Sequence, residues 1–132
     1  MIVGLGHDVC DVRRIRGTLA RYGARFTRRV FTEVERSRCD RRRARAEGYA
    51  RRFAAKEACA KALGTGIRQG VRWRDLEVRN LPSGQPTLRL TGQAAARLRT
   101  LIPAGMAPDI QLTLTDDRDL AYAIVIISAR SD

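Results

Sequence analysis

Phe53-Ala54-Ala55-Lys56-Glu57-Ala58-Cys59-Ala60-Lys61-Ala62-Leu63-Gly64-Thr65-Gly66 is the stretch that decides the fold. Alanine and leucine favour a helix, and Gly64 falls where a left-handed residue would end it. Glu57 and Lys61 are four residues apart and therefore share one helix face. The chain has 24 arginines and two lysines, and both lysines lie here. Because a lysine can bind phosphate as a compact charge and transfer a proton, the helix is predicted to carry chemistry. An ordinary solvated Glu–Lys pair is the alternative interpretation.

Length and charge limit the class of protein. A chain of 132 residues is predicted to form one domain, 1–132, with a hydrophobic core. Its net charge of +12 and pI near 11.2 indicate an acidic or polyanionic partner: nucleic acid, an acidic protein or a phosphorylated small molecule. Aromatic residues make up only 5% of the chain, which argues against a single-strand binder built on base stacking.

The cysteines and the apolar runs indicate a cytoplasmic protein. Cys10, Cys39 and Cys59 show no metal-ligand spacing and cannot all pair, so free thiols in a reducing compartment are expected. No signal peptide is evident. The longest apolar run, 120–127, is far too short to cross a membrane, so no membrane partner is expected.

The N-terminal half is predicted to be a strand followed by helices. The strand spans 1–9; Gly4 and Gly6 allow close packing, and Asp8 comes at its end beside His7. A first helix follows and ends at Gly23. A second, arginine-rich helix starts at a capping box over 32–35 and is broken by Gly48, so that the organising helix begins near Tyr49.

The C-terminal half is predicted to be mostly β. Alternation indicates strands around 76–78 and 88–90, joined by the turn 81–86, and around 110–114 and 120–127, joined by the acidic turn 116–119. A helix over 91–101 lies between the two pairs. The fold class is therefore α+β, with helices packed on a mostly antiparallel sheet.

Four motifs together resemble one family. The strand Ile2–Val9 resembles its opening glycine-x-aspartate strand, and 52–66 looks like its helix and glycine turn. Gly84-Gln85-Pro86 resembles its glycine-x-proline turn, and 112–117 its last loop. In this order, over nearly the whole chain, they are similar to the 4′-phosphopantetheinyl transferases of the small holo-acyl-carrier-protein synthase type. The resemblance implies the phosphopantetheinyl-transferase fold.

The resemblance implies a reaction and a metal. Such an enzyme moves the phosphopantetheine arm of coenzyme A onto a serine of an acyl carrier protein and releases 3′,5′-ADP. A divalent metal, usually magnesium, maps onto Asp8 and Glu57. Two carboxylates and pyrophosphate oxygens suit magnesium, and Lys61 can reach the same phosphates to stabilise the departing ADP. Glu57 and Asp117 are the candidates for the general base.

The resemblance also implies binding surfaces. Members of this type are trimers with shared sites, in which arginines of an adjacent subunit hold part of coenzyme A. The expected contacts to coenzyme A, with Lys56 assigned either a phosphate or a packing contact, are Arg45, Arg51, Arg52, Lys56, Lys61, Gly64, Thr65, Gly66, Gly84 and Pro86. The expected docking residues for the acidic carrier protein are Arg14, Arg21, Arg25 and Arg28.

The last loop departs from the family pattern, because Asp116 stands where a histidine is usual. An ionised aspartate cannot donate to a phosphate and would be repelled by it. Two explanations remain open: Asp116 turns toward the metal as a third carboxylate while His7 supplies a donor, or the loop tolerates the change. A weakened or inactive enzyme is a further possibility.

Two other classes of protein remain as alternatives. A small nucleic-acid-binding protein accounts for the charge but leaves Asp8, Glu57 and the acidic turn unexplained. A degenerate relative would dock a carrier protein without modifying it. The sequence does not identify the carrier, whether of fatty-acid or polyketide synthesis, or show whether acylated coenzyme A is accepted.

Overall fold

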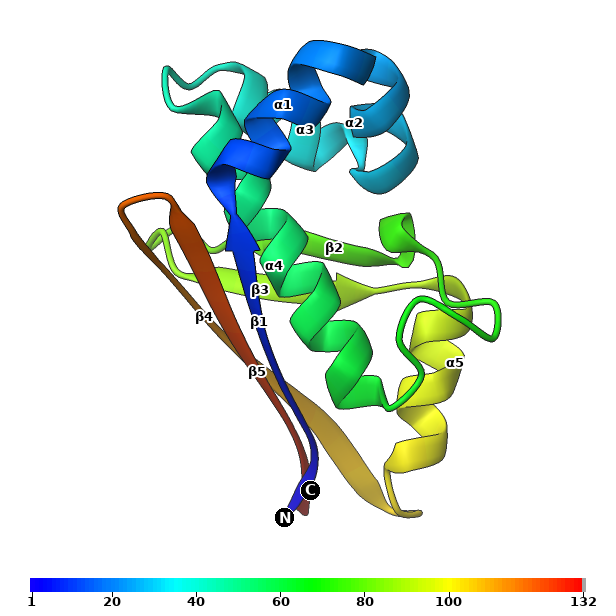
Figure 1. The fold of residues 1–132 in the computed structure, drawn as a ribbon. Coiled ribbons are helices and arrows are strands. Elements are labelled where there is room, and N and C mark those ends of the chain that lie inside the picture. Colours follow the sequence, from blue (N-terminus) through cyan, green and yellow to red (C-terminus); the bar gives the residue numbers. More distant parts are fainter. Residues whose placement is uncertain (132) are drawn as a thin grey trace.

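The computed structural model describes residues 1–131, and an antiparallel sheet runs along one side of it (Figure 1). Three strands form this sheet in the order β1 (Ile2–Asp11), β5 (Leu120–Ser131) and β4 (Met106–Asp117). The register aligns Asp8 of β1 with Ala123 of β5, and Ala123 with Leu114 of β4. Alternate residues of β5, among them Val125 and Ile127, are fully buried and form the floor of the core.

Helix α4 (Arg45–Leu63) packs on the inner face of this sheet and is the centre of the molecule (Figure 1). Its close approach to β1 depends on two glycines. A Cβ atom built on Gly4 would lie 2.2 Å from the carbonyl oxygen of Ala62, and one on Gly6 would lie 1.7 Å from that of Ala58. No side chain fits at either position, so the helix backbone rests directly on the strand, as expected from the sequence.

Three short helices, which we call the helical cap, cover one end of the sheet: α1 (Val12–Tyr22), α2 (Ala24–Val30) and α3 (Glu33–Asp40). The predicted capping box is confirmed, because the backbone N–H of Thr32 donates to Glu35 Oε1 and that of Glu35 donates to Thr32 Oγ1. Helix α2 was missed, because Gly23 ends α1 and at once begins the next helix.

The predicted break at Gly48 is wrong. Helix α3 ends at Asp40, and α4 begins at Arg45 and runs through Gly48. Gly48 packs against α3 rather than forming a turn, and a Cβ atom there would lie in contact with the Sγ atom of Cys39, at 3.4 Å.

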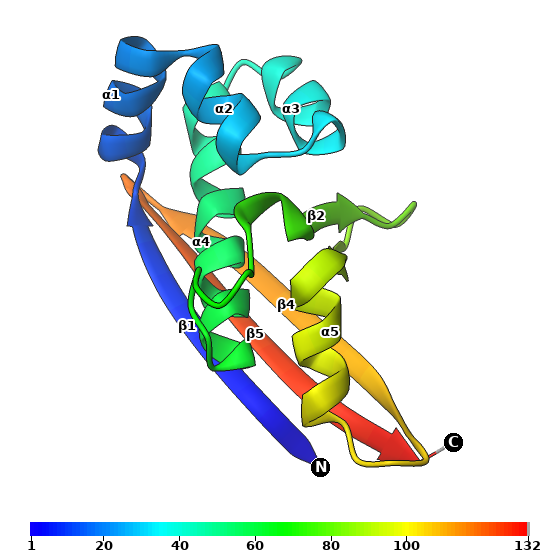
Figure 2. The ribbon, with the colours of Figure 1, turned by 90° about the vertical axis from the view of Figure 1, so that its right-hand side faces the viewer.

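A second layer covers the other side of α4 (Figure 2). It consists of the 3₁₀ turn η1 (Trp73–Asp75), the antiparallel hairpin of β2 (Leu76–Asn80) and β3 (Pro86–Leu90), and helix α5 (Gly92–Leu101). Both predicted hairpins are confirmed, and all strand pairs are antiparallel. Within residues 1–131, no helix combines the length and apolar character needed to cross a membrane.

Candidate functional site

The side chain of Asp8 faces α4 because side chains alternate along β1. Gly4 and Gly6 lie against α4, so Asp8, two residues further on, emerges on the same face. Lys61 Nζ donates to Asp8 Oδ1 at 3.0 Å and to the backbone carbonyl of His7 at 3.0 Å. The strand end and the helix predicted to carry chemistry are therefore joined through the pair Asp8–Lys61.

Glu57 lies one turn before Lys61 and close enough to Asp8 for the two carboxylates to interact electrostatically. Burial raises the pKa of Glu57, the Asp8 carboxylate raises it further, and Lys61 acts in the opposite direction. A bound cation would reduce the repulsion between two carboxylates at a partly exposed site. Both carboxylates also supply the oxygen ligands that magnesium prefers. The pair therefore fits a divalent metal completed by water or substrate oxygens.

A pocket of about 370 Å³ opens beside these carboxylates; we call it the Asp8 pocket. Its lining combines two carboxylates with apolar and aromatic side chains, and Arg14 of α1 contributes positive charge. The lining residues are Asp8, Val9, Cys10, Arg14, Ile15, Thr18, Phe26, Phe53 and Glu57. Burial and the charge of Asp8 raise the pKa of the Cys10 thiol to about 11, so this thiol stays protonated and is not a nucleophile.

Lys56 points away from this pocket into the core. Its side chain is 0% exposed and its ammonium donates to Glu35 Oε1 at 2.7 Å, to the carbonyl of Leu76 at 2.7 Å and to that of Trp73 at 3.0 Å. Of the two roles expected from the sequence, this geometry supports the packing contact. The expected contact to a coenzyme A phosphate is corrected accordingly, because three oxygens already occupy a fully buried ammonium group.

The three arginines expected to contact coenzyme A have different surroundings. Arg45 pairs with Asp40 at 2.7 Å, and Arg51 pairs with Asp116 at 3.4 Å. Arg52 is buried, donates to the carbonyl of Gly48 and to Asn80 Oδ1, both at 3.2 Å, and its Nε has no partner. Burial lowers the pKa of Arg52.

A basic cavity of about 630 Å³ lies between α3 and the end of β2, next to Asn80. Four arginines line it: Arg38, Arg41, Arg42 and Arg79. From the sequence, the arginine-rich segment around α3 was a possible docking surface, but the cavity was not predicted, because only the fold brings Arg79 of β2 to this segment.

The glycine turn ends α4 as predicted. Gly64 has a φ of +80° and its N–H donates to the carbonyl of Lys61, while the N–H of Gly66 donates to that of Ala60. Thr65 is buried and its hydroxyl donates to the carbonyl of Gly66. Gly84, with a φ of +93°, lies in the β2–β3 turn.

Pro86 lines a separate groove of about 340 Å³ against β4 and β5. This groove shares no lining residue with the Asp8 pocket. Within one chain, two residues expected to bind coenzyme A therefore lie at different places: Pro86 at this groove, and Lys61 beside Asp8.

Asp116 does not join Asp8 and Glu57. It lies on β4, which is separated from β1 by β5. Two strand spacings therefore lie between the Cα atoms of Asp116 and Asp8, which is about 9.5 Å or more. Among residues 1–131, no three acidic, histidine or cysteine side chains gather into a metal site. The hypothesis of Asp116 as a third ligand in the same chain is wrong; its partner is Arg51.

His7 also lies outside the pocket. Its side chain is on the face of β1 opposite to Asp8, and only its carbonyl oxygen takes part, as an acceptor for Lys61. The hypothesis that His7 supplies a donor beside the metal ligands is not supported by this arrangement. Asp117 is exposed at the β4–β5 turn and does not line the Asp8 pocket.

This α+β fold is shared with solved structures. The holo-[acyl-carrier-protein] synthase of Neisseria meningitidis matches with a TM-score of 0.85 and 30% identity, over 97% of this chain and 99% of that one. The synthase of Bacillus anthracis, solved in complex with CoA (3′,5′-ADP), matches with a TM-score of 0.78 and 33% identity over 99% of each chain.

The sequence comparisons agree with the structural ones. The family model described as the 4′-phosphopantetheinyl transferase superfamily matches residues 4–123, and the chain belongs to this family. The holo-[acyl-carrier-protein] synthase of Methylobacterium radiotolerans is 70% identical over 98% of this chain and 95% of the relative. That of Chelativorans sp. (strain BNC1) is 66% identical over 99% and 98%.

Proposed function

We propose that this protein transfers the 4′-phosphopantetheine arm of coenzyme A to a serine of an apo acyl carrier protein, giving holo carrier protein and 3′,5′-ADP. The relatives named above support this function, and the complex of the Bacillus anthracis protein supports coenzyme A as the substrate. The observation that carries it is the meeting of Asp8 and Glu57 at one pocket, with Lys61 paired to Asp8. The carrier protein would belong to fatty-acid or polyketide biosynthesis.

The metal in this proposal is magnesium, held by Asp8 and Glu57. Two carboxylates leave most of an octahedral shell to water and substrate phosphates, which suits this ion. Bound there, it would neutralise charge on the phosphates under attack. The removal of divalent cations with EDTA is expected to abolish transfer and added magnesium to restore it; full activity in EDTA would contradict this part of the proposal.

The remaining roles fall to residues of the chain. The serine oxygen forms a bond to the phosphorus that carries the pantetheine arm, and the bond from this phosphorus to the ADP oxygen breaks. Lys61, whose side chain is 52% exposed and pairs with Asp8 of the pocket, stabilises the departing 3′,5′-ADP. Of the two candidate bases for the serine proton, Glu57 lines the pocket and Asp117 does not.

We further propose a homotrimer with shared active sites. The separation of Pro86, at its own groove, from Lys61, beside Asp8, supports it, because a second chain could bring such residues together. The outer face of the sheet also exposes large apolar side chains, with Leu5 65%, Val9 44% and Ile124 41% exposed. Sedimentation equilibrium at assay concentration is the test, and a monomer would contradict the proposal.

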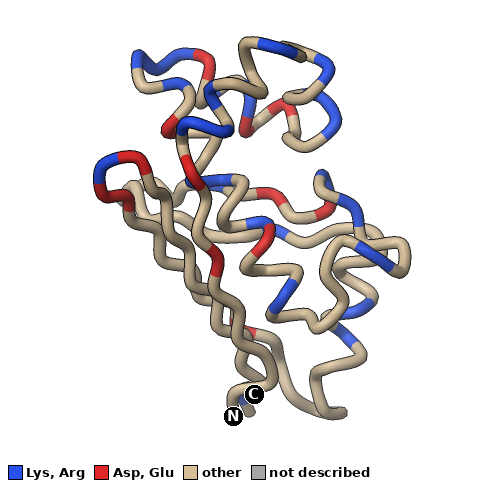
Figure 3. The backbone as a smooth tube through the Cα atoms, in the orientation of Figure 1, with Lys and Arg blue, Asp and Glu red and all other residues tan. Residues whose placement is uncertain are grey.

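The helical cap is the proposed docking surface for the carrier. Arg14, Arg21, Arg25 and Arg28 are all exposed, and Arg14 lines the Asp8 pocket. Figure 3 shows basic residues gathered over the cap, whereas the sheet carries few. An acidic carrier would bind there with an affinity that falls as salt rises.

We assign the protein to the cytoplasm, where its three free cysteines would remain reduced, and propose neither nucleic acid nor membrane as a partner.

The test is the intact mass of a purified apo acyl carrier protein after incubation with this protein, coenzyme A and magnesium. The expected result is a gain of one phosphopantetheine arm on the serine. The matched variant Glu57→Gln keeps the shape of the side chain and is expected to give no gain. An unchanged carrier mass with the wild-type protein, across carriers of both pathways, would leave only the alternative of a docking relative without transfer.

A further inference from the structure

A second arginine-lined space lies beside helix α2 and the turn η1; we call it the arginine cavity. It measures about 640 Å³ and opens between α2, the start of α3 and the segment 67–75. Arginines approach it from two elements: Arg28 and Arg29 from α2, and Arg72 and Arg74 from the segment around η1. The fold thus gathers four guanidinium groups from sequence positions more than forty residues apart.

Little negative charge balances these arginines. Asp75 is the one acidic lining residue; it is buried, accepts from the N–H of Arg72 and the hydroxyl of Thr91, and lies 3.7 Å from Arg72 Nε. Within residues 1–131, Arg28, Arg29 and Arg74 have no carboxylate within 4.0 Å. The cavity therefore keeps an excess of positive charge and attracts acidic groups.

A row of aromatic rings connects the arginine cavity to the Asp8 pocket. Phe26 and Phe53 line the pocket, with ring centroids 6.5 Å apart. Phe53 stacks on Trp73 at 4.9 Å and an interplanar angle of 27°, and Trp73 lines the arginine cavity. Arg28, one of the expected docking residues, also lines the cavity. A partner bound over these rings would reach both sites.

We propose that the arginine cavity holds a second acidic segment of the carrier protein while its serine occupies the Asp8 pocket. This inference rests on the proposed function and adds Arg29, Arg72 and Arg74 to the docking surface. A protein segment suits the site better than a free phosphate does, because the four arginines are exposed and line a wide opening. Carboxylates distributed along a segment can pair with guanidinium groups on both sides of such an opening.

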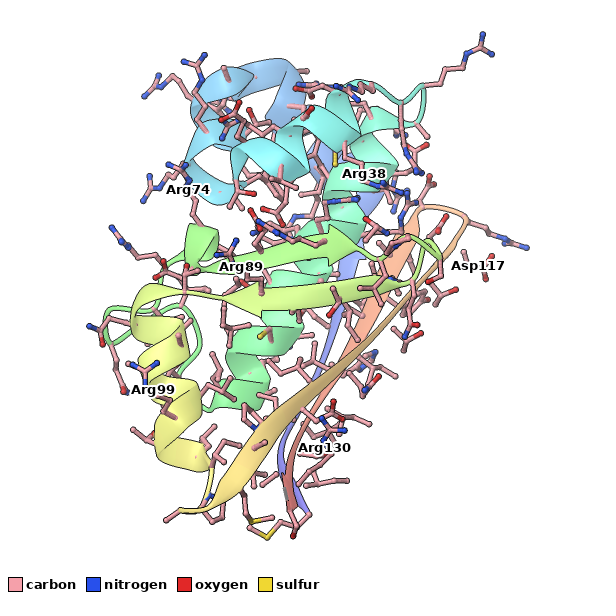
Figure 4. All side chains as sticks on the ribbon, turned by 180° about the vertical axis from the view of Figure 1, so that it is seen from behind. Arg38, Arg74, Arg89, Arg99, Asp117 and Arg130 are labelled. Carbon is pink, nitrogen blue, oxygen red and sulfur yellow. The ribbon has the colours of Figure 1, made fainter. Side chains whose placement is uncertain are left out.

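The test is the double variant Arg29→Gln/Arg74→Gln, since neither side chain makes an ion pair in the described part of the chain. The control is Arg99→Gln/Arg130→Gln, which removes the same charge from the other end of the molecule (Figure 4). Arg130 lies 3.8 Å from Asp109 in a solvent-exposed pair, whose loss is expected to have little effect. In steady-state assays at low ionic strength, we expect the KM for an apo acyl carrier protein to rise about 3- to 10-fold over that of the control. We expect kcat and the KM for coenzyme A to stay unchanged.

Binding of a fluorescently labelled apo carrier, followed by anisotropy without coenzyme A, separates this inference from the proposed function. The double variant is expected to bind more weakly than the control by the same factor, with a shallower dependence on salt. If the wild type bound the carrier but transferred no arm, the proposed function would fail. The ratio of the carrier affinities of variant and control would still test whether the cavity binds the carrier. Equal affinities in variant and control, or a rise in the KM for coenzyme A alone, would overturn the inference.

Discussion

The replacement Lys56→Met is expected to destabilise the fold strongly. Lys56 and Glu35 are both 0% exposed, and Lys56 holds α4 to α3 through Glu35 and to the second layer through the carbonyls of Trp73 and Leu76. Methionine keeps most of the length of the side chain but removes the charge, so Glu35 stays buried without a counter-ion. Removing one partner of a buried pair costs about 3–5 kcal/mol. That is a large share of the roughly 5–15 kcal/mol that stabilises a domain.

Urea unfolding followed by circular dichroism measures this loss as a change in the free energy of unfolding. Glu35→Gln and the double variant complete the cycle, because glutamine keeps the capping group that the start of α3 needs. The double variant buries no unpaired charge, so it is expected to lose about 2 kcal/mol less than the sum of the single losses. Single losses below about 1 kcal/mol, or losses that add within about 0.5 kcal/mol, would refute the reasoning.

Three further predictions concern the strand, the thiols and the last loop. Gly6→Ala is expected to cost about 3 kcal/mol or more in urea unfolding, because its Cβ atom meets the backbone of α4; Gly17→Ala, where nothing lies within 4 Å, is the control and should not destabilise. Burial and Asp8 raise the pKa of Cys10 from 9.0 to about 11, so iodoacetamide should label this thiol in the folded protein only as the pH rises through that window. The stability that the raised pKa of Cys10 contributes is present below pH 9 and is lost as the pH rises from 9 to about 11. Rapid labelling of Cys10 at pH 8 would contradict the raised pKa. Asp116→Asn should leave the magnesium concentration for half-maximal rate unchanged, whereas Asp8→Asn should raise it about 10-fold or more; an equal rise in both would restore Asp116 as a ligand.

Local sequence signals predicted the elements that carry the site. Three of these signals act over only a few residues, and the structure confirms them all. They are the helix-forming residues that end at Gly64, the capping box at Thr32 and the two glycines of β1. The contact of Asp8 with the Lys61 face of α4 followed from the resemblance, and the register of β1 on α4 explains it physically.

The errors came from contacts between distant segments. Gly48 was assigned as a break because its packing partner, Cys39, lies in another helix and cannot be read from neighbouring residues. The burial of Lys56 depends on Glu35, 21 positions upstream. The third-ligand hypothesis for Asp116, one of two explanations left open, failed because the local sequence does not show that β5 separates β4 from β1.

The contact of α4 with the backbone of β1 also affects which substitutions this protein can accept during evolution. The spacing between Asp8 and Glu57 is fixed where main chain meets main chain, at Gly4 and Gly6, and not by the fit of variable side chains. Most core residues can therefore be exchanged for others of similar volume while the two carboxylates keep their separation. Structures with only 30–33% identity to this chain still superpose closely on it. Two positions without side chains thus give the geometry of the candidate site a tolerance to sequence drift that a site held only by packed side chains would lack.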